Sequence, residues 1–465
     1  MNLRLFIAVW IAALLLLSIS PSRSEVAAER TTDHVVLISI DGLRPEFYLD
    51  ESWPAPMLQQ MRQEGAHASA VRSVFPSVTY PAHTTIITGV QPAEHGIFYN
   101  SPFEPEGQTG RWYWEEASIQ VPTLWDAAHE AGLKTASVFW PVTVGAPIDW
   151  NLPEIWPLDW ERDDFTDPLR RTATPEGLVE ELEREATGRL TPRNFSFGRL
   201  TLDERSTEMA AYLLATHKPN LLTVHLVGVD HYQHKGGRQG PMVARALAAL
   251  DRCVARIVEA AELAGILDRT TFLVTGDHGF IELHTEVRPN IWLIEAGLME
   301  AAPDRGTWRA TVHNTSVAGF VFLADPEDDE TLAEVRAIFD SQPEEVRSLF
   351  RILETEEMES LGGASDAVLG LTPVAGAYIS SGTEPPAVEP SSGASHGYLP
   401  DLTPEIYTGL VAWGAGIRAG SSVPILDLDQ IAPLVSELLA LEMPRAEAPL
   451  PEAVLDGDQS GTTPP

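Results

Sequence analysis

Three aspartates of this chain each come directly after a short apolar run. Asp41 follows VVLISI, Asp230 follows TVHLVGV, and Asp277 follows FLVTG. Runs of this kind predict buried strands, and in open α/β sheets the ligand crevice lies outside the carboxyl ends of the strands. One such aspartate alone could be a turn former or a helix cap. Three carboxylates converging on one sheet edge would repel each other strongly unless cations bridged them.

Histidines accompany these aspartates. His234 follows Asp230 by four residues, so the two side chains face the same way if the segment is helical. His278 is adjacent to Asp277 in GDHG, and His396 lies in SHG, on a segment that leads back into the main sheet. Imidazole and carboxylate together suit zinc better than magnesium or calcium, which prefer all-oxygen shells. These residue types therefore favour a zinc site.

The number of candidate ligands fits two ions. Three aspartates and three histidines, with the oxygen of Thr79, can supply two sites of three or four ligands each and leave room for substrate oxygens. Two divalent ions carry four positive charges against three carboxylates, and a Thr79 alkoxide brings the balance near zero, so a phosphate oxyanion could still enter. His231 and His284 are nearby histidines that the sequence alone does not dismiss.

Thr79 lies at the start of the run TYPAHTTIIT, which ends before Gly89. Proline is tolerated in the first turn of a helix and glycine is the usual residue past its end, so Pro81 and Gly89 place Thr79 at or just before a helix N-terminus. Backbone N–H groups and the helix dipole favour an anion there. Thr79 could be a simple N-cap, or it could be a nucleophile, because metal coordination lowers the pKa of a hydroxyl.

The chain alternates short apolar runs with helical patterns, which predicts an α/β fold. We expect a doubly wound, mostly parallel central sheet with helices on both faces. The rhythm changes after residue 279, where 308–325 alternates like a half-exposed strand or hairpin. The expected domains are a catalytic domain of 33–279 and 396–441, a smaller α+β cap inserted at 280–395, and a flexible tail at 444–465. Strands are expected at 34–41, 134–141, 220–230, 270–277 and 408–414, and the clearest helices at 54–65, 121–132, 175–187, 202–216, 239–264 and 427–441.

Composition restricts the partners. Hydrophobic residues make up 44% of the 465 residues, as in a globular protein, and the formal net charge is −36. So acidic a chain is not expected to bind nucleic-acid polymers, because it could not neutralise a row of phosphates. An anionic small molecule would have to be attracted locally, by bound metal cations. The single Cys253 excludes an intramolecular disulfide framework and is expected to be buried in a helix.

Residues 1–24 have the pattern of an export signal peptide. Arg4 supplies a positive start, residues 5–19 form an apolar core, and SPSRS is a small, polar end. The apolar core of about fifteen residues is shorter than the roughly twenty that span a bilayer as a helix. We therefore expect a periplasmic or secreted protein. A protein that stays attached to the membrane by an uncleaved signal is the alternative.

Five segments of the chain resemble, in order, the nucleotide pyrophosphatase/phosphodiesterases, the type I phosphodiesterase branch of the alkaline phosphatase superfamily. The similarity runs from about residue 33 to residue 441 and is carried by ISIDGLRPEF, FPSVTYPAHTTIITGVQPAEHGIFYN, VDHYQH, TGDHGF and SHGY. This resemblance implies an enzyme with two zinc ions per chain. It also implies that Thr79 attacks phosphorus to give a phosphothreonine intermediate, and that Asn100 donates a hydrogen bond to a non-bridging phosphate oxygen. The implied zinc ligands are Asp230, His234 and His396 for one ion, and Asp41, Asp277, His278 and the Thr79 oxygen for the other.

The chain departs from the family pattern near the substrate pocket. The family often carries Glu-Pro ahead of the aspartate that matches Asp230, whereas this chain reads GVD. Tyr80 follows Thr79 where relatives often have phenylalanine. Neither change removes an implied ligand, but both could reshape the pocket. The aromatic region 140–160 could stack a base or an aryl leaving group, or could simply pack a loop; its tryptophans are Trp140, Trp150, Trp156 and Trp160.

These features together predict an exported two-zinc hydrolase of phosphodiester or pyrophosphate bonds in small molecules, nucleotide-like or aryl and alkyl. A phosphomonoesterase or a phosphonate hydrolase of the phosphonoacetate type is the alternative within the fold. No convincing basic motif for the extra monoester charge follows Asn100, which favours diesters. Sulfatase chemistry would need Cys or Ser where Thr79 stands. A non-catalytic binding protein on the same scaffold is a second alternative.

Overall fold

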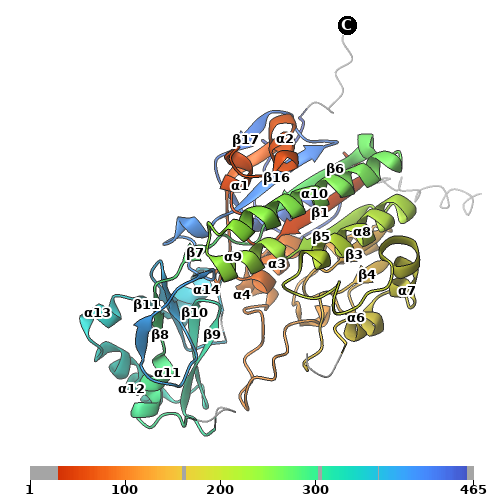
Figure 1. The fold of residues 1–465 in the computed structure, drawn as a ribbon. Coiled ribbons are helices and arrows are strands. Elements are labelled where there is room, and N and C mark those ends of the chain that lie inside the picture. The colour runs from red at the N-terminus through yellow and green to blue at the C-terminus, as the bar shows by residue number, and fades with distance from the viewer. Residues whose placement is uncertain (1–29, 160–163, 302–305, 365, 458–465) are drawn as a thin grey trace, which may run out of the picture.

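A nine-stranded mixed sheet lies at the centre of the protein, in a computed structural model that describes residues 30–159, 164–301, 306–364 and 366–457 (Figure 1). Neighbouring strands run parallel except for β16 (Thr408–Gly414), which is antiparallel to β6 (Thr270–Thr275) and to β2 (Ala66–Arg72). The expected α/β fold with a mostly parallel sheet is thereby confirmed. From one edge the order is β17 (Ser421–Val423), β2, β16, β6, β1 (His34–Ile40), β5 (Leu221–Leu226), β3 (Thr135–Val138) and β4 (Trp150–Leu152), and β18 (Leu426–Asp427) also pairs with β2.

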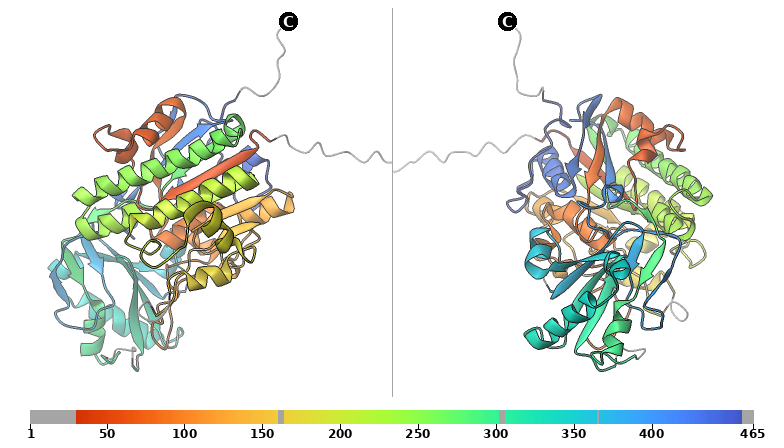
Figure 2. Two further views of the ribbon diagram at one scale, coloured as in Figure 1. Left: turned by 45° about the vertical axis from the view of Figure 1, so that its right-hand side comes forward. Right: turned by 90° about the vertical axis from the view of Figure 1, so that its left-hand side faces the viewer.

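Helices cover both faces of this sheet. Alternate residues of β1 point to opposite sides, so the strand presents apolar side chains to both faces. Val36 belongs to the hydrophobic cluster on one face, which includes α8 (Leu200–His217) and α10 (Pro241–Leu263). These two long helices lie side by side (Figure 2). Val35 belongs to the cluster on the opposite face, and both valines are fully buried. The helices of that second face are α3 (Thr79–Thr88), α5 (Leu124–Glu130) and α15 (Ile431–Leu439).

The main body has further short helices. The expected helix at 175–187 is the short α7 (Leu178–Leu182) continued by a π-helical turn, Glu183–Thr187. Cys253 is buried in α10, as expected. The other short helices are α1 (Glu46–Leu49), α2 (Pro56–Glu64), α4 (Pro92–His95), α6 (Asp167–Thr172) and α9 (Gly228–Gly236).

The chain between β6 and β16 builds small sheets with a hydrophobic cluster of their own, at the lower left of Figure 1. The segment 308–325 forms the hairpin of β9 (Ala310–Thr315) and β10 (Ala318–Leu323). Where this part leaves and rejoins the main body, β7 (Ile281–Glu282) pairs with β15 (Ala394–Ser395). The other elements are β8 (Thr285–Val287), α11 (Pro289–Glu295), α12 (Asp329–Asp340), α13 (Glu344–Arg347), β11 (Phe350–Glu354), α14 (Thr355–Ser360), β12 (Leu369–Pro373), β13 (Ala377–Ile379) and β14 (Val388–Pro390).

The C-terminal segment differs from the expected flexible tail up to residue 457. Val454 is fully buried in the second hydrophobic cluster, and its carbonyl accepts a hydrogen bond of 2.9 Å from the N–H of Arg418. Leu455 forms a β-bridge with Ile417. Burial of an apolar side chain together with these backbone hydrogen bonds holds the segment against the sheet.

Three expectations fall wholly or partly outside the described residues: the signal peptide at 1–24, Trp160, and the last part of the tail, 458–465. Within the described ranges, none of the helices combines the length and the apolar character that are needed to cross a bilayer.

Candidate active site

The central strands bring the three aspartates to one edge of the sheet. Asp41 directly follows β1, and Asp277 lies two residues beyond β6, which pairs with β1. β5, on the other side of β1, ends at Leu226, so the strand expected at 220–230 is too long. Asp230 lies instead in the first turn of α9.

Asp203 accounts for this early end of β5. Its Oδ1 accepts hydrogen bonds from the N–H groups of Val227, at 2.7 Å, and Gly228, at 3.3 Å. A carboxylate that accepts from free N–H groups at a helix start stabilises the helix in place of a longer strand. Because α9 is helical, Asp230 and His234 are on one face of it, as the four-residue spacing predicts.

The first group of side chains consists of Asp41, Asp277 and His278. The ligand atoms of these three buried residues all lie within 4.8 Å of one another. Nε2 of His278 is 3.1 Å from Oδ2 of Asp277 and 3.4 Å from Oδ1 of Asp41. The other oxygen of Asp277, Oδ1, accepts hydrogen bonds from the N–H groups of Gly42 and His278.

The second group consists of Asp230, His234 and His396, whose ligand atoms also lie within 4.8 Å of one another. Nε2 of His234 is 3.3 Å from Oδ1 of Asp230 and 3.2 Å from Nε2 of His396. The two groups are in contact, because the rings of His278 and His396 stack with centroids 3.5 Å apart. The structure therefore brings all six side chains together, in the two sets that the family resemblance implies.

The three histidines are oriented alike. Nδ1 of each faces a backbone carbonyl: Ala394 for His234, Gly279 for His278 and Ser77 for His396. A carbonyl only accepts, so Nδ1 carries the proton and Nε2 presents a lone pair to the carboxylates, which is the tautomer that metal-ligating histidines adopt.

Several buried atoms of the two groups have no hydrogen-bond partner. An unpaired buried polar group costs about 1–3 kcal/mol, and more if it is charged. Lone pairs of nitrogen and oxygen at these distances also repel one another unless a cation lies among them. These donor sets therefore fit metal ions, and mixed nitrogen and oxygen donors fit zinc. The unpartnered atoms are Oδ1 of Asp41, Oδ1 of Asp230, Oδ2 of Asp277 and Nε2 of His278.

Burial and the neighbouring charges shift the pKa values of these groups. Burial, with the charge of Asp230, raises the pKa of Asp41, and burial with the charge of Asp41 raises that of Asp277. Burial would also raise the pKa of Asp230, but His234 and His396 outweigh it and the pKa is lowered. Burial lowers the pKa of His396 to about 4, with a further contribution from His234. Bound cations would stabilise the ionised carboxylates and so lower their pKa values again.

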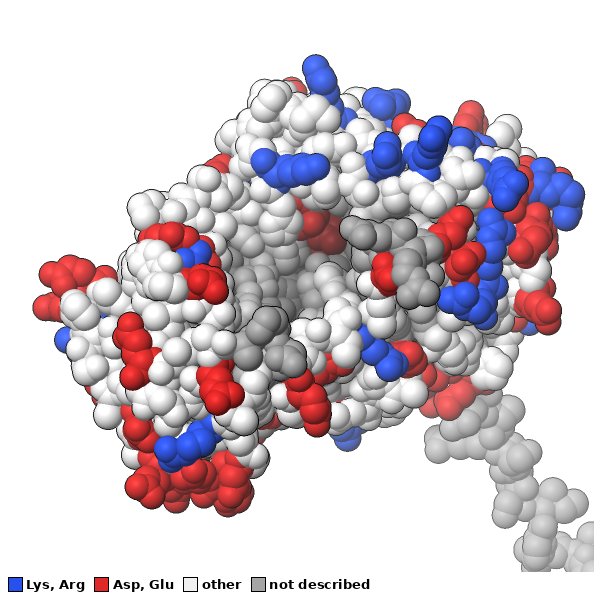
Figure 3. Space-filling model, turned by 60° about the horizontal axis from the view of Figure 1, so that its bottom comes forward, with Lys and Arg blue, Asp and Glu red and all other residues white. Residues whose placement is uncertain are grey.

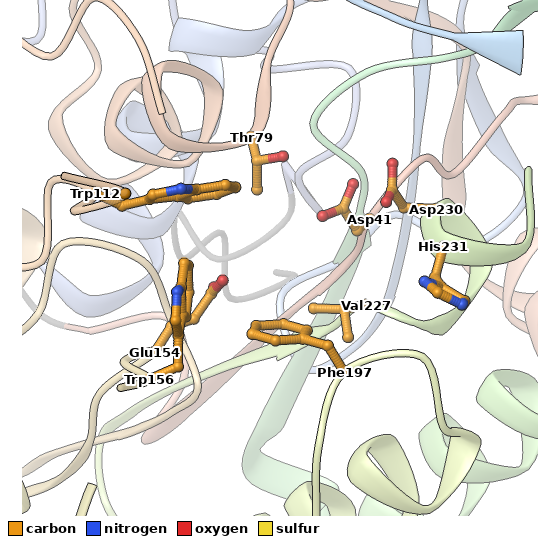
Figure 4. A pocket seen from close by; sticks show the side chains of 10 residues that line it. Asp41, Thr79, Trp112, Glu154, Trp156, Phe197, Val227, Asp230 and His231 are labelled. Carbon is orange, nitrogen blue, oxygen red and sulfur yellow. The ribbon is translucent and has the colours of Figure 1, made fainter. Parts of the chain in front are cut away.

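Thr79 is the first residue of α3, and Val78 holds the N-cap position without a side-chain cap. The cap comes from Asn100, whose Oδ1 accepts a hydrogen bond of 2.9 Å from the N–H of Tyr80. Thr79 is therefore not an N-cap. Its hydroxyl is turned toward the carboxylates of Asp41 and Asp230 (Figure 4). The amide nitrogen of Asn100 remains as a donor beside the same helix end.

A cavity of about 400 Å³ opens beside Thr79. Trp112, which was not expected here, meets Tyr80 and Trp156 edge-on at 5.0 and 4.9 Å. The aromatic run RWYW at 111–114 is its signal in the sequence. Among the described residues that line it, none is Lys or Arg. On the face drawn in Figure 3, the Lys and Arg side chains lie around the hollow and not inside it. The lining consists of Asp41, Thr79, Gly110, Trp112, Glu154, Trp156, Phe197, Val227, Asp230 and His231.

The four tryptophans noted in the sequence have different surroundings. Trp156 lines the cavity. Trp140 is fully buried, against His83 at 5.0 Å, and Trp150 stacks on His217 at 4.3 Å, so both pack the protein interior or its edge. Trp160 lies outside the described residues. The stacking role considered for this region therefore concerns Trp156, together with the unanticipated Trp112.

A mixed sheet between helical layers, with aspartates and histidines gathered at the strand ends, is an alkaline-phosphatase-like architecture. Residues 35–398 match the family described as type I phosphodiesterase / nucleotide pyrophosphatase. The chain belongs to this family.

Similar proteins agree with this assignment. Ectonucleotide pyrophosphatase/phosphodiesterase family member 3 of Rattus norvegicus is 24% identical over 277 residues, which cover 55% of this chain and 27% of that protein. Venom phosphodiesterase 2 of Crotalus adamanteus is 24% identical over 261 residues, or 54% of this chain and 27% of that protein. The chain thus spans about a quarter of the length of these curated relatives.

Solved structures share the fold. Human ectonucleotide pyrophosphatase/phosphodiesterase 5 superposes with a TM-score of 0.62 at 17% identity, over 88% of this chain and 95% of that one. The murine protein 5, in an inactive threonine-to-alanine form in complex with AMP, gives a TM-score of 0.62 at 17% identity, over 88% and 96% of the two chains.

Proposed function

We propose that the protein is a two-zinc hydrolase of phosphodiester or pyrophosphate bonds in small molecules, with Thr79 as the nucleophile. The observation that carries the proposal is the pair of buried donor groups, with unpartnered atoms, beside the hydroxyl of Thr79. Family membership supports the same chemistry, as do the relatives that are named phosphodiesterases and pyrophosphatases.

The two groups would each hold one zinc ion. Asp230, His234 and His396 would bind one, and Asp41, Asp277, His278 and the Thr79 oxygen the other. Bound there, zinc would supply charge neutralisation for a phosphate and a lowered pKa for a coordinated hydroxyl or water.

Side chains and backbone groups of the protein carry out the attack on phosphorus and stabilise the charge that develops. Oγ1 of Thr79 attacks phosphorus, so that a phosphorus–oxygen bond forms to Thr79 as the bond to the leaving group breaks, and the leaving oxygen takes up a proton. Water then cleaves the phosphothreonine and restores the hydroxyl. The amide nitrogen of Asn100 and the N–H of Thr79 at the start of α3 stabilise the charge on the non-bridging oxygens, because they are fixed before the reaction begins.

The cavity favours substrates with one phosphate beside an apolar or aromatic group. Trp112, Trp156 and Phe197 offer aromatic surfaces, whereas no described lining residue is a Lys or Arg that could pair with a second anionic group. The AMP bound to the murine structural neighbour has such a composition, an adenine ring with a single phosphate.

A substrate panel tests this proposal on zinc-loaded protein. An aryl phosphodiester, the matching monoester, ATP and phosphonoacetate should be compared by kcat/KM. We expect the diester to exceed the monoester by about tenfold or more, because the site lacks a basic group for the second monoester charge. A higher kcat/KM for the monoester or for phosphonoacetate would replace the diesterase assignment, and no hydrolysis of any of them would favour a binding protein.

We also propose that 280–395 is an insertion in a catalytic domain of 33–279 and 396–441. The pairing of β7 with β15 supports this division, because it holds the two ends of the inserted part together. Phe75 and Tyr99 of the main body pack against Phe320 of the inserted part, so replacing 285–391 by a short Gly-Ser linker should give a less stable chain that still folds and binds metal. Aggregation of that chain, with the intact protein soluble, would argue for one indivisible domain.

Export is a further part of the proposal and rests on the composition of residues 1–24. Fused to a reporter enzyme that is active only after export, residues 1–29 should give activity outside the cytoplasm. Arg4→Glu with Leu15→Arg should abolish it. A reporter that stays inside the cell would rule export out.

A further inference from the structure

A hydrogen-bonded pair, His225 and Glu154, lies directly behind Asp41. His225 is the penultimate residue of β5, beside Ser39 of β1, and is 1% exposed, while Glu154 is 3% exposed. A histidine buried in a strand is costly unless its ring nitrogens are hydrogen-bonded. Here both are: Nδ1 lies 2.9 Å from Oε2 of Glu154 and Nε2 lies 3.2 Å from Oδ2 of Asp41.

This contact determines which oxygen of Asp41 is available. Oδ2 is engaged by His225, whereas Oδ1 has no partner and lies 3.4 Å from Nε2 of His278. Asp277 has the same division, with Oδ1 engaged by two backbone N–H groups and Oδ2 without a partner. Each carboxylate of this group thus has one oxygen held and one presented. Backbone groups hold Asp277, but a side chain holds Asp41.

Glu154 orients the ring of His225. Both partners of the ring are carboxylates, so a ring with a proton on each nitrogen satisfies both. The ring of His83 packs against that of His225, with 4.2 Å between centroids.

We propose that His225 and Glu154 are positioning residues that hold Asp41 with Oδ1 directed to the metal site it shares with Asp277 and His278. The proposal rests on the two-zinc function. Second-layer partners of this kind commonly change metal affinity by about 10–100-fold when they are removed. The effect should be confined to one of the two ions, because the second group, around Asp230, has its own partners.

Metal titration tests this pairing without relying on activity. Apo-protein would be titrated with Zn²⁺ against a chromophoric chelator, and with Co²⁺ by its visible absorption. The informative variant is His225→Phe with Glu154→Leu, which removes both hydrogen bonds and leaves no unpaired buried Glu154. We expect one ion bound as in the wild type and the other weakened about 10–100-fold. Glu154→Gln, which keeps an acceptor oxygen for His225, should weaken that ion less.

His34→Phe is the matched control. His34 is the first residue of β1, at the end of the strand opposite to Asp41. It is 6% exposed, and its ring makes a hydrogen bond of 2.8 Å to the carbonyl of Pro219. The His34→Phe variant should bind two ions like the wild type. In the double variant kcat on an aryl diester should fall and recover with excess zinc, a recovery that a packing defect would not show.

The outcomes separate the two proposals. Two ions bound with wild-type affinity in the folded double variant, or equal losses in it and in His34→Phe, would overturn the positioning role and leave the two-zinc function intact. Fewer than two ions in the wild type would overturn the function itself. If the double variant does not fold, unchanged metal affinity in Glu154→Ala, which withdraws the partner of His225, would overturn the positioning role.

Discussion

Asn100 caps helix α3 and is the proposed hydrogen-bond donor to the phosphate, and different substitutions can separate these two roles. Its Oδ1 accepts from the N–H of Tyr80 and so caps α3, while its amide nitrogen is the proposed donor to the phosphate. Asn100→Ala removes both groups. Asn100→Asp keeps the acceptor for Tyr80 but replaces the donor with a negative oxygen, which faces the proposed phosphate position.

The two variants should therefore rank in opposite order for stability and activity. Loss of the cap in Asn100→Ala should lower the free energy of unfolding by about 1 kcal/mol. Asn100→Asp should be as stable as the wild type or more so, because a carboxylate interacts favourably with a helix N-terminus. Loss of a preorganised donor should lower kcat about 10²–10³-fold in Asn100→Ala, equivalent to roughly 3–4 kcal/mol. Asn100→Asp should lose at least as much, since its charge repels the substrate.

The assay is denaturant unfolding of zinc-loaded protein, paired with initial rates on an aryl phosphodiester. Thr88→Ala, in the last turn of α3, serves as control: its hydroxyl donates to the carbonyl of Thr84 and is remote from the phosphate position. It should change stability slightly and kcat hardly at all. A fully active Asn100→Asp enzyme, or an Asn100→Ala enzyme with normal kcat, would refute the assignment of Asn100 as a phosphate donor.

Three further outcomes follow from the same geometry. Thr79→Ala should lower kcat/KM on the aryl diester by at least about a thousandfold while two zinc ions remain bound; unchanged hydrolysis would remove Thr79 as nucleophile. Removal of zinc by a chelator should lower the melting temperature, and added zinc should restore it. A ligand at 100 times its Kd adds about 3 kcal/mol to the free energy of unfolding. Fewer than two ions per loaded chain would contradict the bimetallic site. Burial raises the pKa of Asp203 to about 7, so the folded state binds this proton more tightly than the unfolded chain. The stability that this group contributes is complete below about pH 4 and is lost as pH rises through 7, by roughly 4 kcal/mol at most. Asp203→Asn should flatten the dependence of unfolding free energy on pH in this range. Parallel pH profiles of the wild type and the variant would refute the raised pKa of Asp203.

Three central strands, β1, β5 and β6, could be predicted because each is a short apolar run with an aspartate shortly after it. Those aspartates and the histidines near them suggested a metal site, and the family resemblance supplied the two ligand sets. The structure brings the six side chains together, although their role as ligands stays a prediction. The strand at 220–230 was predicted too long because the cap on α9 comes from Asp203, which lies on a different helix.

Other features depended on contacts between distant segments. His225 and Glu154 lie 71 residues apart and meet only because the sheet order places β3 beside β5 and β4 beside β3. Val454 looked like part of a loose tail, since its neighbours in sequence are polar and proline-rich. Its burial depends on packing in the second hydrophobic cluster and on the hydrogen bond from Arg418, contacts between distant segments that no local pattern reveals.

The placement of His396 has a consequence for how the protein matures. It follows β15 directly and lies 162 residues from His234, so the two halves of this proposed metal group are separated by the chain between β7 and β15. A growing chain that ends before residue 396 would lack the side chain that completes the proposed group. Metal loading there would therefore await synthesis and folding of the insertion, and the ion would then close a loop of that length as a non-covalent cross-link.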